Sequence, residues 1–201
     1  MPKVILQATS NASPDGGLGG GAMTGMSSTG HSSSTASCSS VAFSGFGSDN
    51  DQQTKSASWS GFPAGPSSGR VLVQLKVDWA VSGSESASAD TGDGGSANAD
   101  SFFDLEYSIN NGSTWNSIRS ASAGCNEITS PTSLSDNGPT TITLSTGQDL
   151  TQVKVREKLQ SVTDAAGGEF SGASSSASTT SSISSLQIEV TTNDAQLIVC
   201  A

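Results

Sequence analysis

The only histidine of the chain, His31, is the first residue to consider for catalysis, because a serine nucleophile is usually activated by a neighbouring histidine. It lies in the stretch GGGAMTGMSSTGHSSS, which has no periodic pattern, and a catalytic triad would have to recruit it from there. One histidine also excludes a zinc site built from several histidines. We therefore expect His31 to be a solvated loop residue, and we expect no hydrolase chemistry based on a triad.

Three arginines and one tyrosine are the residues that could bind a sugar carboxylate and attack an anomeric carbon. Arg70 and Arg156 alternate with apolar residues in two segments with a strand pattern, so both are expected to point away from the core. Tyr107 falls on the apolar side of its own segment, where packing is the usual role. Arg119 is the third arginine. Neither these four residues nor any pair of carboxylates indicates a glycosidase. We therefore predict that the protein is not an enzyme.

Residues 108–115, SINNGSTW, resemble the Asp-box, S-x-D-x-G-x-T-W, of sialidases and other β-propeller proteins, with Asn110 in place of the aspartate. In those families the motif is usually an element of the fold, remote from the catalytic site. Apolar and polar residues alternate over 102–109, and the following Asn-Gly pair tolerates the positive φ angles of a tight turn. The chain has no internal repeat, so a propeller is not expected. We predict a structural hairpin with a polar clasp and an aromatic anchor, formed by Ser108, Asn110, Gly112, Thr114 and Trp115.

The segment DTGDGG, residues 90–95, resembles part of a calcium-binding loop, but it lacks the downstream glutamate that completes an EF-hand. We predict no metal and no cofactor, and leave open whether Ca²⁺ binds near Asp90 and Asp93. The three cysteines, Cys38, Cys125 and Cys200, lack the spacing of metal ligands. They are predicted to be free thiols, with a Cys38–Cys200 bridge as the alternative.

The elements that would position these residues are short strands rather than helices. From Val71 to Val81 every second residue is apolar, a period of two that places the apolar side chains on one face of a strand. We predict an all-β fold, an antiparallel β-sandwich of jelly-roll or immunoglobulin-like type, over residues 41–201. The Ser-rich segments 82–100 and 171–182 are expected to be long polar loops. Further strand candidates lie at 41–46, 56–62, 102–109, 140–145, 150–159, 183–192 and 195–201.

Residues 1–40 are expected to form an extended Gly/Ser-rich N-terminal arm, because few apolar side chains could offset the entropy lost on ordering it. Near its start, Val4, Ile5 and Leu6 form a short apolar strand. We predict that this strand adds to the sheet edge of a neighbouring subunit. Deleting residues 1–30 is then expected to block assembly and to leave the melting of the isolated subunit unchanged. The alternative is a disordered tail without a role.

Composition excludes several classes of partner. The chain has 201 residues, a net charge of −10 and only eight lysines and arginines, so no basic face for nucleic acid can be assembled. Binding to an anionic membrane is disfavoured for the same reason, and no apolar segment approaches the ~20 residues of a membrane span. The start, MPKVILQATSNAS, lacks the apolar core of a signal peptide, so we expect synthesis in the cytoplasm without export by the secretory route.

Five patterned segments follow one another along the chain: SASWSGFP, VLVQLKVDWAVSG, FDLEYSINNGSTWNSI, TITLSTGQDLTQVKVREKLQS and SLQIEVTT. Taken together, over residues 54–192, they resemble the β-sandwich modules of tailed-bacteriophage structural proteins. The resemblance implies a non-enzymatic virion component of a tail, fibre, collar or head decoration, which assembles with copies of itself and with other virion proteins. Two alternatives remain open. One is a carbohydrate-binding or adhesin module that recognises a host-surface glycan through exposed aromatic residues, with or without calcium, and the other is an extracellular fibre subunit. Trp59 is the candidate for such an exposed residue, because Trp79 and Trp115 lie in line with apolar strand faces and are expected in the core.

Overall fold

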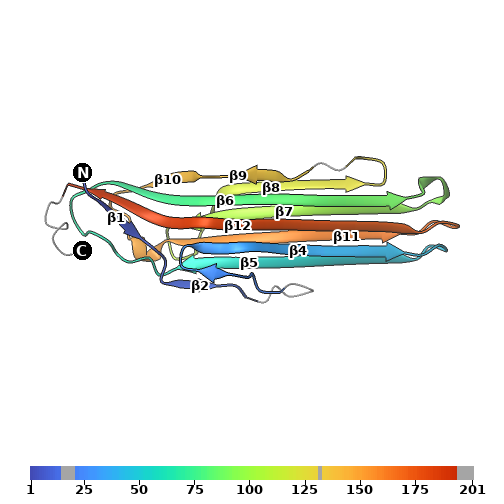
Figure 1. The fold of residues 1–201 in the computed structure, drawn as a ribbon, viewed down its shortest axis with the longest axis horizontal. Coiled ribbons are helices and arrows are strands. Elements are labelled where there is room, and N and C mark those ends of the chain that lie inside the picture. Colours follow the sequence, from blue (N-terminus) through green and yellow to red (C-terminus); the bar gives the residue numbers. More distant parts are fainter. Residues whose placement is uncertain (15–20, 131–132, 194–201) are drawn as a thin grey trace.

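Two antiparallel β-sheets pack face to face in the computed structural model, which describes residues 1–14, 21–130 and 133–193 (Figure 1). The described residues form twelve strands and only two single-turn 3₁₀ helices, Thr91–Asp93 and Leu150–Gln152. The predicted all-β antiparallel sandwich is therefore confirmed. The strand expected at 195–201 lies outside the described residues, as does Cys200.

The first sheet, sheet A, is built on three long strands: β4 (Gly30–Ala42), β6 (Arg70–Ala89) and β12 (Ala173–Thr192). β12 is central, and β4 and β6 pair with its two sides. Four short strands extend this framework: β1 (Lys3–Leu6) along β12 beyond β4, β3 (Met26–Ser27) beside β4, and both β9 (Ser135–Asn137) and β10 (Thr140–Leu144) along the outer edge of β6.

The second sheet, sheet B, contains five strands in the order β2 (Ser10–Ala12), β5 (Ser48–Ser60), β11 (Lys154–Ala166), β7 (Ser96–Ser108) and β8 (Asn116–Asn126). Its central strand, β11, pairs along almost its whole length with β5 and β7. Three arches pass from one sheet to the other and join β4 to β5, β6 to β7 and β11 to β12. The arches, residues 43–47, 90–95 and 167–172, lie together at the end far from the N-terminus, which we call the distal tip (Figure 1).

Large apolar side chains fill the half of the sandwich nearer the N-terminus. The predicted alternation from 73 to 81 is confirmed, because every second residue there is buried, whereas Val71 is 44% exposed. Trp79 stacks on Phe103 of the opposite sheet with 5.3 Å between the ring centroids. This core also contains Trp59, Phe62, Leu105, Leu159, Ile183 and Ile188.

Small side chains fill the distal half, where serine and threonine hydroxyls pair between the sheets. Ser161 Oγ donates to the carbonyl of Ala36 at 2.9 Å and lies 3.0 Å from Thr179 Oγ1. The hydroxyls of Ser40 and Thr163 lie 2.9 Å apart. This pairing satisfies polar groups that burial would otherwise penalise. The space around them is filled by Ala97, Ala99, Ala165, Ala173, Ala177, Cys38 and Cys125.

The long polar loops predicted at 82–100 and 171–182 are wrong for most of their length. Residues 82–89 complete β6, 96–100 begin β7 and 173–182 begin β12. Serine and alanine differ little in size and give weak hydropathy contrast, so the pattern hides strands whose buried face is made of Ala and Ser. The opposite error occurs at 41–46, where most of the expected strand belongs to an arch.

Residues 30–40, expected to lie in an extended arm, form most of β4 and pair with the central strand of sheet A. A domain boundary after residue 40 therefore falls inside β4. Lys3–Leu6 pairs with residues 188–191 of β12 in the same chain, and Leu6 is buried. The strand pairing expected of Val4, Ile5 and Leu6 is thus made within the chain, while their role in assembly stays a prediction.

Candidate functional site

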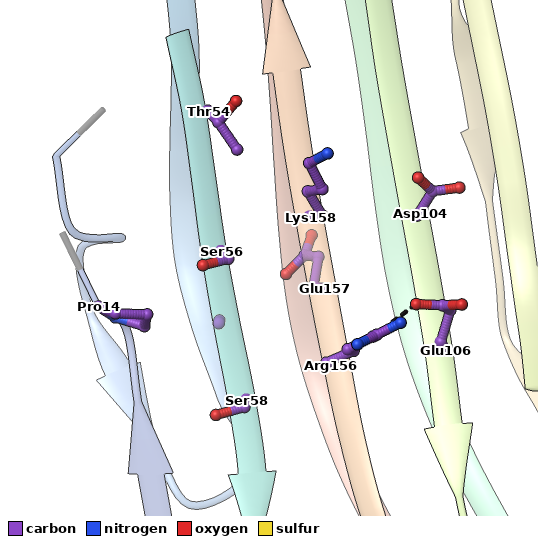
Figure 2. Close-up of a pocket in the computed structure, with 10 residues that line it drawn as sticks. Pro14, Thr54, Ser56, Ser58, Asp104, Glu106, Arg156, Glu157 and Lys158 are labelled. Atoms are coloured by element: carbon purple, nitrogen blue, oxygen red, sulfur yellow. Dashed lines mark hydrogen bonds and ion pairs between the residues drawn. The ribbon is translucent and has the colours of Figure 1, made fainter. Parts of the chain in front are cut away.

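A shallow groove of about 590 Å³ lies on the outer face of sheet B (Figure 2). Strand register places Arg156 of β11 opposite Glu106 of β7, and Arg156 Nε donates to Glu106 Oε2 at 2.6 Å. The next outward pair along the same strands is Lys158 and Asp104. The groove floor is therefore charged but balanced. The rest of the lining is Pro14, Ala57, the hydroxyls of Thr54, Ser56 and Ser58, and Glu157, whose side chain is not exposed.

Trp115 lies on this outer face, against the outward-pointing Arg156. Its expected place in the core, inferred from its alignment with an apolar strand face, is therefore wrong. Its side chain is half-buried, and the guanidinium of Arg156 sits 4.0 Å from the centroid of its ring. Such a cation–π contact holds the arginine at the end of the groove. Trp59 and Trp79 are buried. Of the three tryptophans, Trp115 alone is therefore placed to meet a ligand.

The segment 108–115 closes on itself through side-chain hydrogen bonds. Ser108 Oγ accepts from the backbone N–H of Gly112 at 2.9 Å. Asn110 Oδ1 accepts from Thr114 N at 2.9 Å, and Asn110 Nδ2 donates to Thr114 Oγ1 at 2.8 Å. The amide of Asn110 thus supplies the acceptor oxygen that an aspartate would supply, plus a donor. Asn111 takes the positive φ of 59° expected for this turn.

The three arginines are held by different partners on different elements. Arg70 donates to the backbone carbonyls of Ala64 and Gln148, at 2.6 and 2.7 Å. Arg119 pairs with Asp136 of β9, and Arg156 pairs with Glu106. The structure therefore does not bring them together around one carboxylate site. Tyr107 packs against the main core, as expected from its apolar strand face.

His31 is buried, so its expected place in a solvated loop is wrong. Its Nε2 lies 2.7 Å from Glu157 Oε2, and neither side chain is exposed. Burial alone would lower the pKa of His31, but the hydrogen bond and negative charge of Glu157, with the carbonyl of Ser32, outweigh it and raise the pKa above its usual value. The ring also stacks on Trp59, with 6.2 Å between centroids. This pair is closed to ligands and acts within the core.

The segment 65–69, GPSSG, has the G-x-S-x-G spacing of a hydrolase nucleophile turn, which needs a helix directly after the serine. Here the segment leads into β6. The residue spacing of the motif is therefore present, but the helix that would make the serine a nucleophile is replaced by a strand.

Three phenylalanines are displayed at the distal tip. Phe43 and Phe46 on the first arch are 79% and 70% exposed, and Phe170 on the third arch is 80% exposed. Phe43 and Phe170 line one hollow, together with Val41 at the end of β4. The backbone N–H groups of Gly45 and Phe46 both donate to the carbonyl of Gly168, at 2.9 and 3.3 Å. The backbones of the first and third arches are therefore joined, and Phe43 and Phe170 share one hollow at the tip.

Asp93, on the second arch, ties the tip together. Its carboxylate accepts from Phe170 N and from Ser171 Oγ, both at 3.0 Å. Loss of hydration would raise the pKa of Asp93, but hydrogen bonds from Phe170, Ser171 and Gly95 outweigh it and hold the pKa below its usual value. A side chain at Gly168 would clash, since an added Cβ would meet the Asp93 carboxylate. The close approach of these two arches requires glycine there.

The candidate calcium ligands Asp90 and Asp93 both have protein donors in the structure. Asp90 Oδ1 accepts from Gly92 N at 2.9 Å and caps the 3₁₀ turn, while Asp93 binds the third arch. No cluster of three potential metal ligands occurs among the described residues. Cys38 and Cys125 are buried free thiols, and burial raises the pKa of each.

Comparison with protein-family models and with curated protein sequences finds no match to this chain. No helix in the described part of the chain is long and apolar enough to cross a membrane.

Sequence reasoning missed the distal tip because its parts are far apart in the chain. Phe43, Phe46 and Phe170 stand in Gly/Ser-rich surroundings, FSGFG and GGEFSG, without periodic neighbours. That pattern is itself a signal, since an isolated aromatic residue among turn formers has no strand face to pack on. Their convergence depends on the crossing of the two sheets, which the local sequence does not reveal.

Proposed function

We propose that this protein is a non-enzymatic structural subunit of a larger assembly, in its most specific form a tailed-phage virion component of a tail, fibre, collar or head decoration. The observation that carries the proposal is the display of Phe43, Phe46 and Phe170 on a tip far from the N-terminus. Contiguous exposed apolar surface is unfavourable on an isolated soluble protein and marks interaction sites. Contact through this tip with other virion proteins gives the exposed rings a role.

The outer face of sheet A in the distal half supports lateral packing between subunits. β-strand register aligns outward hydroxyls in rows across three strands. The hydroxyl rows are uncharged and their groups both donate and accept hydrogen bonds, so they suit contact with a copy of the chain or another polar protein face. The aligned residues are Ser82, Ser84, Ser86 and Ser88 on β6, Ser174, Ser176, Ser178 and Thr180 on β12, and Thr35, Ser37 and Ser39 on β4.

One long sheet edge is protected against uncontrolled pairing. Asp49 Oδ2 accepts from the backbone N–H of Val41 at 3.0 Å, and Gln53 Oε1 accepts from that of Ser37 at 2.7 Å. Side chains of β5 thus occupy donors of the neighbouring β4 edge. Because the β4 edge is occupied in this way, association is directed to the faces and the tip of the subunit. Contacts there can be specific, as an ordered particle requires.

Particle composition tests the proposal. Mass spectrometry of purified phage particles, from a host in which the gene is expressed during infection, is expected to find this chain in many copies per particle. A Phe43→Ser/Phe170→Ser variant is expected to fold normally and to be lost from the particles, whereas Ile109→Ser, at the opposite end, is retained. Absence of the parent chain from particles would contradict the proposal.

A second candidate function, recognition of a host-surface glycan, is favoured by the groove beside Trp115. Hydroxyls and paired charges line the groove, and the ring of Trp115 packs against Arg156, one of its lining residues. Ligand sites typically combine aromatic side chains with a few placed polar groups. A glycan array is the test. Binding that disappears in Trp115→Ala and Arg156→Ala but survives in Phe43→Ser would favour this function over tip-mediated assembly.

A further inference from the structure

We propose, on the basis of the assembly function above, that the distal tip docks into a protein partner that offers an apolar pocket bordered by lysine and arginine. Two independent properties of the tip define this partner. The first is the set of exposed phenylalanines, and the second is the distribution of charge over the molecule.

Phe46 indicates that the aromatic rings at the tip serve binding and not folding. Its φ is 61°, in the left-handed region that favours glycine, and its side chain is 70% exposed. The neighbouring Gly45 has a φ of 84°. A large side chain in this conformation strains the backbone and gains no burial in return. Residues held in such conformations cluster at functional sites.

The partner's pocket must accept at least two rings. Phe43 and Phe170 line a hollow whose other walls are backbone and small side chains of β4, β6 and β12. The hydrogen bonds of Asp93 and Gly168 join the arches, so the backbone that carries the rings is held in place before a partner arrives. Pre-organised aromatic anchors are typical of the residues that dominate interface affinity.

The charge of the distal half indicates which residues should border the partner's pocket. All eight lysines and arginines lie outside segments 32–54, 82–102, 122–130 and 160–183, which build the distal half. The same segments carry nine carboxylates: Asp49, Asp51, Glu85, Asp90, Asp93, Asp100, Glu127, Asp164 and Glu169. The distal half therefore projects a negative field around its apolar end. Complementary interfaces place positive charge against such a field.

The same charge distribution argues against two other occupants. A second copy docked tip to tip would bring like charges together around the rings. An anionic membrane would be repelled by the carboxylates that surround them. A basic protein surface is the occupant that satisfies both the rings and the charge.

Selection of peptides from a random display library tests this chemistry. The parent protein is immobilised for selection, and Phe43→Ser/Phe170→Ser is used for counter-selection. Enriched peptides are expected to combine aromatic or aliphatic residues with Lys or Arg. Their affinity is expected to fall at least about tenfold in Phe43→Ser/Phe170→Ser, as for loss of anchor residues. It is expected to fall about two- to fivefold in Glu169→Gln, as for an exposed charge pair, and to weaken in high salt.

Ile109→Ser serves as the matched control, because it removes an exposed apolar residue just after β7, at the end of that strand opposite the arch 90–95, and should leave peptide affinity unchanged. Equal peptide affinity for parent and tip variants would overturn the proposal, as would enriched peptides without basic residues. Self-association lost in Phe43→Ser/Phe170→Ser would identify a second copy as the occupant instead. Phe-dependent flotation with vesicles of phosphatidylcholine, alone or mixed with phosphatidylglycerol, would identify a membrane.

The peptide experiment and the particle experiment fail separately. A tip that selects basic peptides in a chain absent from particles leaves the docking chemistry standing and removes the virion function. A chain that is found in particles but whose tip selects no basic peptides would support the virion function and remove the proposed docking chemistry.

Discussion

Phe46 has a backbone conformation that glycine would adopt more easily, so folding and binding place different demands on this residue. The left-handed region costs an L-residue about 1–2 kcal/mol of folding free energy. Glycine avoids this cost, but its greater conformational freedom in the unfolded chain cancels part of the gain. We predict that Phe46→Gly raises the free energy of unfolding by about 0.5–1 kcal/mol. Urea denaturation measures this. Phe46→Ala keeps the unfavourable φ and should give no gain; equal stabilisation by both variants would show that removal of the exposed ring is the cause.

The buried His31–Glu157 pair makes stability depend on pH in the neutral range. His31→Leu leaves Glu157 buried without its partner, and we predict a loss of about 3–5 kcal/mol in the free energy of unfolding. Glu157→Gln in the same background removes the buried charge and should recover part of that loss.

The direction of the pH dependence follows from the raised pKa of His31 in the folded protein. The stabilisation is complete below the unfolded-state pKa, and it is lost as pH rises through the higher folded-state pKa. Denaturation midpoints measured from about pH 6 to about pH 9 should therefore decline in the parent. The decline should be absent in His31→Leu; an unchanged slope in that variant would assign it to other groups.

At the scale of elements, β1 is part of the fold. It pairs with β12, Lys3 Nζ lies 2.8 Å from Glu189 Oε1, and Leu6 and Ala8 are buried. We predict that removing residues 1–8 lowers the free energy of unfolding by about 2–5 kcal/mol, the range for loss of a buried leucine. This replaces the expectation that the whole segment 1–30 can be lost without effect on melting, since Met23 is buried as well.

Deletion of residues 1–8 also uncovers a stretch of β12, so the truncated protein should show concentration-dependent light scattering. Ile5→Ser is the matched control, because Ile5 is 46% exposed and its strand pairing is retained. A truncated chain that melts with the parent would show that β1 contributes nothing to the isolated subunit.

Sequence patterns predict the elements of this protein where large and polar residues alternate, and fail where both faces of a strand are small. The strand at 73–81 is readable because valine, leucine and tryptophan alternate with polar residues. Its continuation to Ala89 carries serine on one face and Gly83, Glu85, Ala87 and Ala89 on the other, and the first half of β12 carries only Ser, Thr and Ala. Those strands are specified by partners far away in sequence, which local periodicity does not contain.

The same limit applies to the candidate sites. The hairpin at 108–115 is local and could be predicted down to its turn at Asn111-Gly112. The pair His31–Glu157 joins residues 126 positions apart, and the tip joins three arches. No short stretch of sequence contains either arrangement. Exposed phenylalanines in glycine-rich segments were the one available sign of the tip.

At the scale of the whole molecule, the two halves of the sandwich differ in how they are held together. One half has a core of tryptophan, phenylalanine, leucine and valine, together with all eight lysines and arginines. The distal half has hydroxyl pairs, alanines and an excess of carboxylates. Repulsion among those carboxylates and the small area of buried apolar surface both weaken the distal half. Local opening is therefore expected to begin at the tip, away from the large apolar core.

The hydroxyl-rich interior of the distal half has a calorimetric consequence. Unfolding raises the heat capacity through newly hydrated apolar surface and lowers it through newly hydrated polar surface. An interior of Ser, Thr and Ala supplies less of the first and more of the second, so the heat-capacity change per residue should fall below the usual ~12–15 cal/mol/K. The enthalpy of unfolding then varies less with temperature, and the stability curve is broad. Differential scanning calorimetry over a series of melting temperatures, shifted by pH, measures this slope directly. A value at or above the usual range would mean that the distal half buries as much apolar surface as an ordinary core.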